Sequence, residues 1–81
     1  MNELIQNIDK IHTTELGTIR IKKNLKIESD VNDYCKKIIL NKESIINIKG
    51  KNYYVSFNNI IITINKNSYT IITAHQKRKL L

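Results

Sequence analysis

Apolar residues recur at intervals of three and four positions through the first half of the chain, the spacing of a buried helix face. The first stripe predicts a short helix over residues 2–11. Threonine hydroxyls then precede Glu15, a pattern that favours the start of a second helix reaching Leu25. We expect Leu16 and Ile19 to face inward in this second helix.

The third helix has the most regular pattern. Ser29 or Asp30 can cap its first turn, because a short polar side chain accepts from the unpaired backbone N–H groups there. Its apolar positions follow at helical spacing: Val31, Tyr34, Cys35, Ile38 and Ile39. Cys35 lies within this stripe and is therefore expected in the core.

After Asn41 the apolar period changes to two, which is typical of strands. Strands are predicted over residues 45–49, 53–57, 60–65 and 68–75. The connections between them are short, and Gly50 and the Asn58-Asn59 pair tolerate left-handed backbone angles. The strands are therefore expected to form an antiparallel meander.

This order of elements predicts one α+β domain, with two to three N-terminal helices packed on one face of a four-stranded sheet. The helical half covers residues 1–42, the sheet residues 43–75, and a basic tail residues 76–81. One side of the third strand is apolar, and the other sides of the strands mix apolar residues with hydroxyl, amide and imidazole groups. Such a sheet is expected to pack on one face and to function on the other.

Composition excludes several classes of protein. A hydrophobic content of 41% argues against a disordered chain, and no apolar run is long enough to span a membrane. Cys35 is the single cysteine, so no internal disulfide can form, and we expect no metal and no cofactor. The first residues lack the basic and apolar regions of a signal peptide. We therefore expect a cytoplasmic protein, or one delivered into the cytoplasm of a target cell.

The charge of the chain is uneven. Ile, Asn and Lys supply 40 of the 81 residues, a bias of the kind that an AT-rich genome produces, and it inflates the net charge of +7. That bias does not explain why residues 44–81 contain six basic side chains and no acidic one. The asymmetry favours a surface that binds a polyanion, and RNA is the expected partner.

No standard catalytic motif is present, so candidate chemistry rests on scattered residues. Metal-free RNA cleavage needs a base, an acid and donors for the phosphate, and histidine suits both proton-transfer roles. We predict that His12 and His75 share the acid–base work, that Arg20 and Lys23 hold the phosphate, and that Thr70 or Thr73 assists. Five further residues are predicted to bind RNA: Lys49, Lys51, Tyr54, Asn65 and Ser68.

Each of these residues also has a purely structural explanation. His12 can cap a helix entry, and His75 can simply end a strand at the surface. A buried ion pair with Glu15 would explain Arg20 as well as phosphate binding does. Threonine is common in strands without any function.

Three segments resemble a small bacterial family of unassigned function: His12-Thr13-Thr14-Glu15-Leu16-Gly17, Arg20-Ile21-Lys22-Lys23-Asn24-Leu25 and Ser68-Tyr69-Thr70-Ile71-Ile72-Thr73-Ala74-His75. The order of elements is similar to that of the barnase–EndoU–colicin–RelE ribonucleases, many of which are toxins. In those enzymes the last strand often carries a Thr, Ser or His of the site, which Thr70, Thr73 and His75 would match. This comparison concerns architecture and not sequence.

Three hypotheses follow. The first is a metal-independent endoribonuclease, the toxin of a toxin–antidote pair with an acidic neutralising partner. The second is a non-catalytic RNA- or ribosome-binding module that uses the same basic face. The third is a protein adaptor that pairs through an exposed strand edge. The sequence leaves the oligomeric state open.

Overall fold

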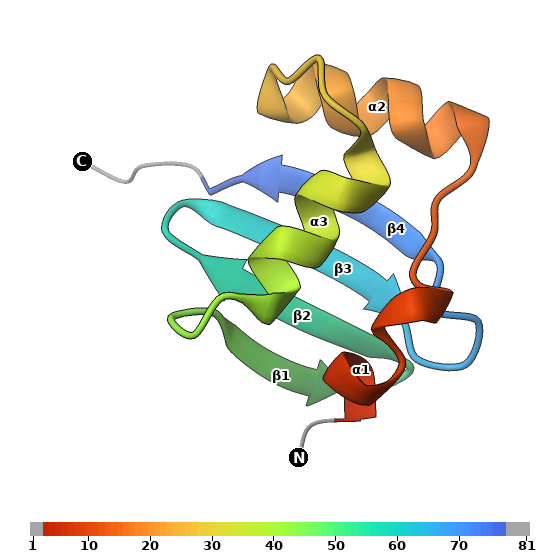
Figure 1. The fold of residues 1–81 in the computed structure, drawn as a ribbon, viewed down its shortest axis with the longest axis vertical. Helices are drawn as coiled ribbons and strands as arrows, with labels where there is room; N and C mark the ends of the chain where they lie inside the picture. The colour runs from red at the N-terminus through yellow and green to blue at the C-terminus, as the bar shows by residue number, and fades with distance from the viewer. Residues whose placement is uncertain (1–2, 78–81) are drawn as a thin grey trace.

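Helices cover one face of an antiparallel sheet in the computed structural model, which describes residues 3–77 (Figure 1). The chain begins with the single-turn helix α1 (Glu3–Gln6) and the 3-10 helix η1 (Ile8–Lys10). The longer helices α2 (Glu15–Leu25) and α3 (Val31–Leu40) follow. The strands come last, namely β1 (Ile45–Lys49), β2 (Asn52–Phe57), β3 (Ile60–Asn65) and β4 (Ile71–Gln76).

The sheet has the predicted meander order, β1-β2-β3-β4, with each neighbouring pair antiparallel. The predicted turn residues explain the short connections. Gly50 has a φ of 62° between β1 and β2, and Asn58 has a φ of 52° between β2 and β3. Both angles lie in the left-handed region that these residue types tolerate. The prediction of an α+β fold with this sheet is therefore confirmed.

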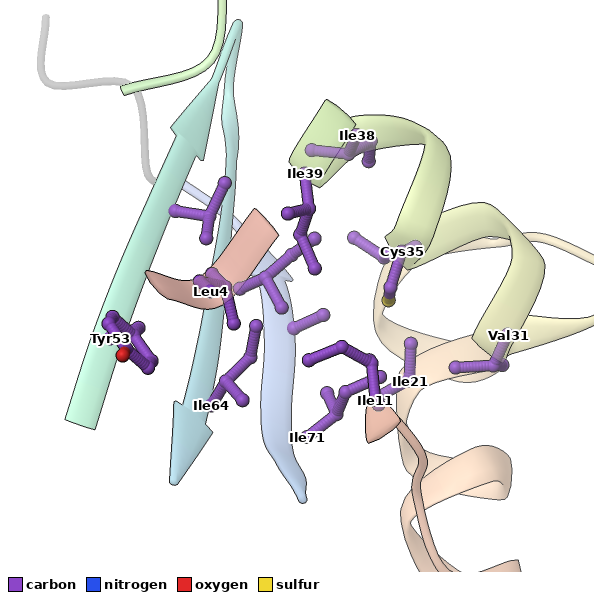
Figure 2. Close-up of a cluster of buried hydrophobic side chains, with 14 residues drawn as sticks. Leu4, Ile11, Ile21, Val31, Cys35, Ile38, Ile39, Tyr53, Ile64 and Ile71 are labelled. Atoms are coloured by element: carbon purple, nitrogen blue, oxygen red, sulfur yellow. The ribbon is translucent and has the colours of Figure 1, made fainter. Parts of the chain in front are cut away.

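The core fills the space between the sheet and the helices, as Figure 2 shows. Tyr53, Val55, Ile62 and Ile64 contribute from the middle strands, and α3 places Cys35 against them. Asp30 caps α3, because its carboxylate accepts from the backbone N–H of Asp33 at 3.3 Å. Both the cap and the buried stripe of α3 follow the prediction.

Helix α2 has its predicted length but not its predicted orientation. Leu16 and Ile19, expected inward, are 60% and 64% exposed, whereas Ile21 and Leu25 are buried. The rotation is set by contacts with β4 rather than by the number of apolar residues on each side. Asn24 of α2 also contacts β4, because its side-chain amide donates to the carbonyl of Ala74 at 3.3 Å.

Two other predicted elements are shorter than expected. The expected helix over residues 2–11 is interrupted at Asn7, where α1 ends and η1 begins. The expected strand over residues 68–75 starts only at Ile71, because Tyr69 has a left-handed φ of 58°. Gln76 continues β4, and residues 78–81 of the predicted basic tail lie outside the described residues.

None of the helices within residues 3–77 has the length and apolarity needed to cross a lipid bilayer.

Candidate functional site

The segment that enters α2 lies beside the start of β4 and extends the sheet by one short parallel pairing. His12 pairs with Thr70. The backbone N–H of His12 donates to the carbonyl of Tyr69 at 3.3 Å, and the N–H of Ile71 donates to the carbonyl of His12 at 2.7 Å. Two of the predicted site residues, 58 positions apart in sequence, are therefore neighbours in the fold.

The residues after His12 lock this pairing in place. The hydroxyl of Thr13 donates to the carbonyl of Ile71 at 3.2 Å. Thr14 caps α2, since its side-chain oxygen accepts from the backbone N–H of Gly17 at 3.0 Å. A Cβ atom at Gly17 would stand 2.3 Å from the Thr13 hydroxyl oxygen, so any larger residue here would displace the Thr13 side chain. The sequence from His12 to Gly17 thus serves to hold the histidine at the edge of β4.

The imidazole ring of His12 is fixed by hydrogen bonds at both nitrogens. Nδ1 lies 2.8 Å from the carbonyl oxygen of Lys10, and because a carbonyl has no proton, Nδ1 must be the donor. In the neutral ring, Nε2 is then the unprotonated nitrogen and accepts from the hydroxyl of Thr70 at 3.2 Å. The ring is exposed, so its basic nitrogen lies at the surface.

The hydrogen bonds continue beyond Thr70 to Ser68 and Asn65. The hydroxyl oxygens of Ser68 and Thr70 are 2.8 Å apart, and that of Ser68 is 3.2 Å from the side-chain oxygen of Asn65. With neutral His12, Ser68 donates to Thr70 and Thr70 to the ring. With protonated His12 the direction reverses: the ring donates to Thr70, Thr70 donates to Ser68, and Ser68 donates to Asn65. The same four side chains can therefore satisfy the ring in both protonation states.

Tyr69 makes this arrangement possible through its backbone. Its φ of 58° is uncommon for a residue with a side chain. The ring of Tyr69 stacks on that of Tyr53, with centroids 6.5 Å apart, and the ammonium group of Lys10 lies 5.8 Å from its centroid. Packing of the Tyr69 ring thus offsets the unfavourable backbone angle. Such angles concentrate at functional sites.

His12 and Thr70 lie on the uncovered face of the sheet. Directly paired residues share a face, and Ile64 pairs with the buried Ile71, so the neighbouring Thr70 points the other way. Among residues 3–77 no helix packs on this second face (Figures 1 and 2). We call it the open face.

Cross-strand rows define the open face. The row nearest His12 contains Asn52 and Asn65, the next runs through Asn47, Tyr54, Thr63 and Thr73, and the last contains Ser56, Ile61 and His75. Thr63 pairs with Thr73 and Ile64 with Ile71, so Ile72 is an extra residue in β4 without a cross-strand partner. Because of this extra residue, Ala74 lies on the buried face. The predicted site residues Tyr54, Asn65, Thr73 and His75 thus share this face with His12.

Lysines gather at the end of the sheet where His12 lies. Lys49 and Lys51 flank the β1–β2 turn, and Lys66 follows β3 at the same end (Figure 1). The two turns are joined, because the backbone N–H of Lys66 donates to the carbonyl of Lys51 at 2.8 Å. All three side chains are exposed. The candidate site therefore borders a basic rim.

The structure does not bring every predicted residue to His12. His75 stands near the far end of β4, five residues beyond Thr70, which is about 16 Å along a strand. Arg20 and Lys23 are exposed on α2, on the side turned away from β4. The exposure of Arg20 also excludes the buried ion pair with Glu15.

Sequence reasoning missed Lys10 and Tyr69. Lys10 acts through its backbone carbonyl, which orients the histidine, and a carbonyl leaves no signature in sequence. Tyr69 acts through a left-handed angle that tyrosine rarely adopts. The one indication in the sequence was that Tyr69 lies between two predicted site residues, Ser68 and Thr70.

The buried ionisable groups do not belong to this site. Burial, and to a lesser extent the carboxylate of Asp30, raises the pKa of the Cys35 thiol to about 12. Burial, followed by the Glu3 carboxylate, raises the pKa of Tyr53 to about 12, and its hydroxyl donates to Glu3 at 3.2 Å. A thiol held in this way is a poor nucleophile. Residues 3–77 contain no group of three or more His, Cys, Asp or Glu side chains arranged to hold a metal ion.

The fold and site define a small α+β protein with a histidine–hydroxyl cluster on an open sheet. A family model described as "Protein of unknown function (DUF3781)" matches residues 5–75, and the chain belongs to this family. The resemblance to a family of unassigned function is therefore confirmed. No curated protein matches the chain, and no solved structure matches it.

Proposed function

We propose that this protein is a metal-independent endoribonuclease in which His12 is the general base. The observation that carries the proposal is the 3.2 Å contact between Nε2 of His12 and the Thr70 hydroxyl. It shows that the basic nitrogen of an oriented, exposed imidazole already faces a hydroxyl group. The 2′-hydroxyl of a ribose would take the place of that hydroxyl.

The reaction follows from this placement. His12 removes the proton of the 2′-hydroxyl while its oxygen attacks the adjacent phosphorus, and the bond from phosphorus to the 5′-oxygen breaks. Solvent water donates a proton to the departing 5′-oxygen, since the site is exposed. The products carry a 2′,3′-cyclic phosphate and a 5′-hydroxyl. Thr70 is then positioned to accept from the imidazolium form of His12, and Ser68 to accept from Thr70.

The remaining residues have roles in binding under this proposal. The lysines of the rim, Lys49, Lys51 and Lys66, attract the phosphates, and Tyr54 stacks on a base along the open face. His75 and Thr73 are too far along β4 for the phosphate at His12, so we assign them to RNA contacts. Arg20 and Lys23 have no role at the reacting phosphate.

A nuclease that acts on cytoplasmic RNA must be restrained in the cell that makes it. We therefore include in the proposal a toxin role and an acidic neutralising protein as partner. The support is the charge distribution, because residues 44–81 contain six basic side chains and no acidic one.

Total RNA incubated with purified protein in EDTA tests the activity. We expect cleavage with 2′,3′-cyclic phosphate ends, and we expect His12→Ala to slow it by about 10²–10⁴-fold. His75→Gln is the matched control, since it should weaken RNA affinity but leave the rate at saturating RNA unchanged. Intact RNA with the wild-type protein, or equal cleavage by His12→Ala, would refute the proposal.

The open face favours one alternative, a non-catalytic RNA-binding module. Tyr54 lies there beside Asn52, whose side-chain amide is 3.5 Å from the tyrosine hydroxyl, and Asn47 is its cross-strand neighbour. An aromatic ring flanked by amides can stack on an unpaired base and contact its edges. Salt-sensitive RNA binding that survives His12→Ala, without cleavage by either protein, would establish this function instead.

A further inference from the structure

Helix α2 carries a second stripe of residues on the side turned away from the sheet. With 3.6 residues per turn, positions 16, 19, 20 and 23 lie on one side of the helix and positions 18, 21 and 25 on the other. Ile21 and Leu25 are buried against the sheet, which fixes the first set outside. We call Leu16, Ile19, Arg20 and Lys23 the outer stripe.

Neither the fold nor the candidate active site uses the outer stripe. Leu16 and Ile19 expose 60% and 64% of their surface, and Arg20 and Lys23 are exposed beside them. Scattered exposed apolar residues are ordinary, but these two occupy neighbouring turns of one helix and continue directly into two cations. The result is an apolar strip with a basic end.

We propose that the outer stripe of α2 binds an acidic protein segment that presents an amphipathic helical face. The apolar positions of such a segment would cover Leu16 and Ile19, and its carboxylates would pair with Arg20 and Lys23. The charge of α2 supports an acidic partner. The helix holds Arg20, Lys22 and Lys23 against the single acid Glu15, and Lys26 follows at its C-terminal cap.

Other occupants fit the stripe less well. RNA would pair with the cations but would leave Leu16 and Ile19 in water, because phosphates and riboses offer them little apolar surface. A second copy of this chain would bring Arg20 and Lys23 of both copies into one interface, and the outer stripe has no carboxylate to pair with them. A protein segment with both carboxylates and aliphatic residues matches all four side chains. This inference does not depend on the proposed ribonuclease activity.

The test uses the full chain, labelled with ¹⁵N, and a synthetic helical peptide about five turns long with leucines on one face and flanking glutamates. A matched peptide carries lysine in place of each glutamate. We expect the acidic peptide to perturb amide signals of residues 15–25 and to bind at least about tenfold tighter than the basic one.

Three double variants complete the experiment, each checked for an unchanged thermal unfolding transition. Leu16→Ser/Ile19→Ser and Arg20→Glu/Lys23→Glu should each weaken binding of the acidic peptide by about tenfold or more. Leu40→Ser/Lys42→Glu is the control, because Leu40 is 53% exposed at the end of α3 and Lys42 is exposed close by. That variant should bind like the wild type.

Several outcomes would overturn the inference. These are equal binding of both peptides, perturbation outside α2, absence of binding, or stripe variants that bind like the wild type. Perturbation of the outer stripe by single-stranded poly(U), but not by the acidic peptide, would assign it to RNA and would also overturn it.

Discussion

The hydroxyl oxygen of Thr70 lies 3.2 Å from Nε2 of His12, and the other ring nitrogen is held by the carbonyl of Lys10 at 2.8 Å. These two contacts fix the orientation and the tautomer of the neutral ring, because Nδ1 must donate to the carbonyl and Nε2 can then accept from the hydroxyl. A nitrogen spectrum of the ring at alkaline pH should therefore show the tautomer with the proton on Nδ1. A proton on Nε2 would contradict the assignment.

Replacement of Thr70 by valine should reduce cleavage without unfolding the protein. Valine keeps the shape of threonine but cannot donate to His12 or accept from Ser68. We expect the rate at saturating RNA to fall by about tenfold, and Thr70→Ser to restore most of it. The measurement is single-turnover cleavage of a short RNA, with thermal unfolding as the control for stability. An unchanged rate would remove Thr70 from the mechanism.

Gly17→Ala should destabilise the protein, although alanine is normally the better helix residue by about 1 kcal/mol. The added Cβ would stand 2.3 Å from the Thr13 hydroxyl oxygen and would break the hydrogen bond of Thr13 to Ile71. We expect a net loss of about 1–2 kcal/mol in urea unfolding. The double variant Thr13→Ala/Gly17→Ala should lose less than the sum of the single variants. Full additivity would show that the close approach has no energetic consequence.

Lysines at the rim should control how steeply RNA affinity falls with salt. Each phosphate contact on a single strand contributes about 0.7 to the slope of log K against log salt. Lys49→Gln/Lys51→Gln/Lys66→Gln should therefore lower that slope by about 2. Lys36→Gln/Lys37→Gln on α3 provides a control on the covered side of the sheet. An equal reduction by both variants would mean that RNA follows net charge and not this rim.

Stability should decline as the pH rises from about 9 toward 12. The ordinary thiol pKa is 9.0, and burial raises that of Cys35 to about 12. Between these values the unfolded chain has released the thiol proton while the folded chain still holds it, so rising pH favours the unfolded state. Tyr53 acts in the same sense between 10.0 and about 12. Urea titrations at several pH values should show a shallower decline for Cys35→Ala, whereas equal slopes would exclude a contribution from this thiol.

Local signals account for the parts of the fold that the sequence predicts. The Asp30 cap and the apolar stripe specify α3 within its own residues, and Gly50 and Asn58 specify two of the turns. Each of these features depends on side chains a few positions apart. For the same reason, the α+β order and the meander could be predicted before the packing was known.

Features that depend on distant contacts could not be predicted in this way. Leu16 and Ile19 were expected inside because α2 has apolar residues on two sides, and only its packing on β4 decides between them. His12 and Thr70 were both candidates, but nothing local joins residues 58 positions apart. The predicted partnership of His12 with His75 fails because His12 pairs with Thr70, and His75 lies five residues further along β4. The sequence did not show which residue near β4 would pair with His12.

The parallel pairing of His12 with Thr70 also sets when the site can exist during synthesis. A growing chain gains His12 58 positions before Thr70, and the ring has no hydroxyl partner until Thr70 has emerged and the last strand has joined the sheet. Contacts between such distant residues form late in folding. A chain interrupted anywhere before Thr70 would therefore lack the assembled site, and under the proposed function it would be harmless to the cell that made it.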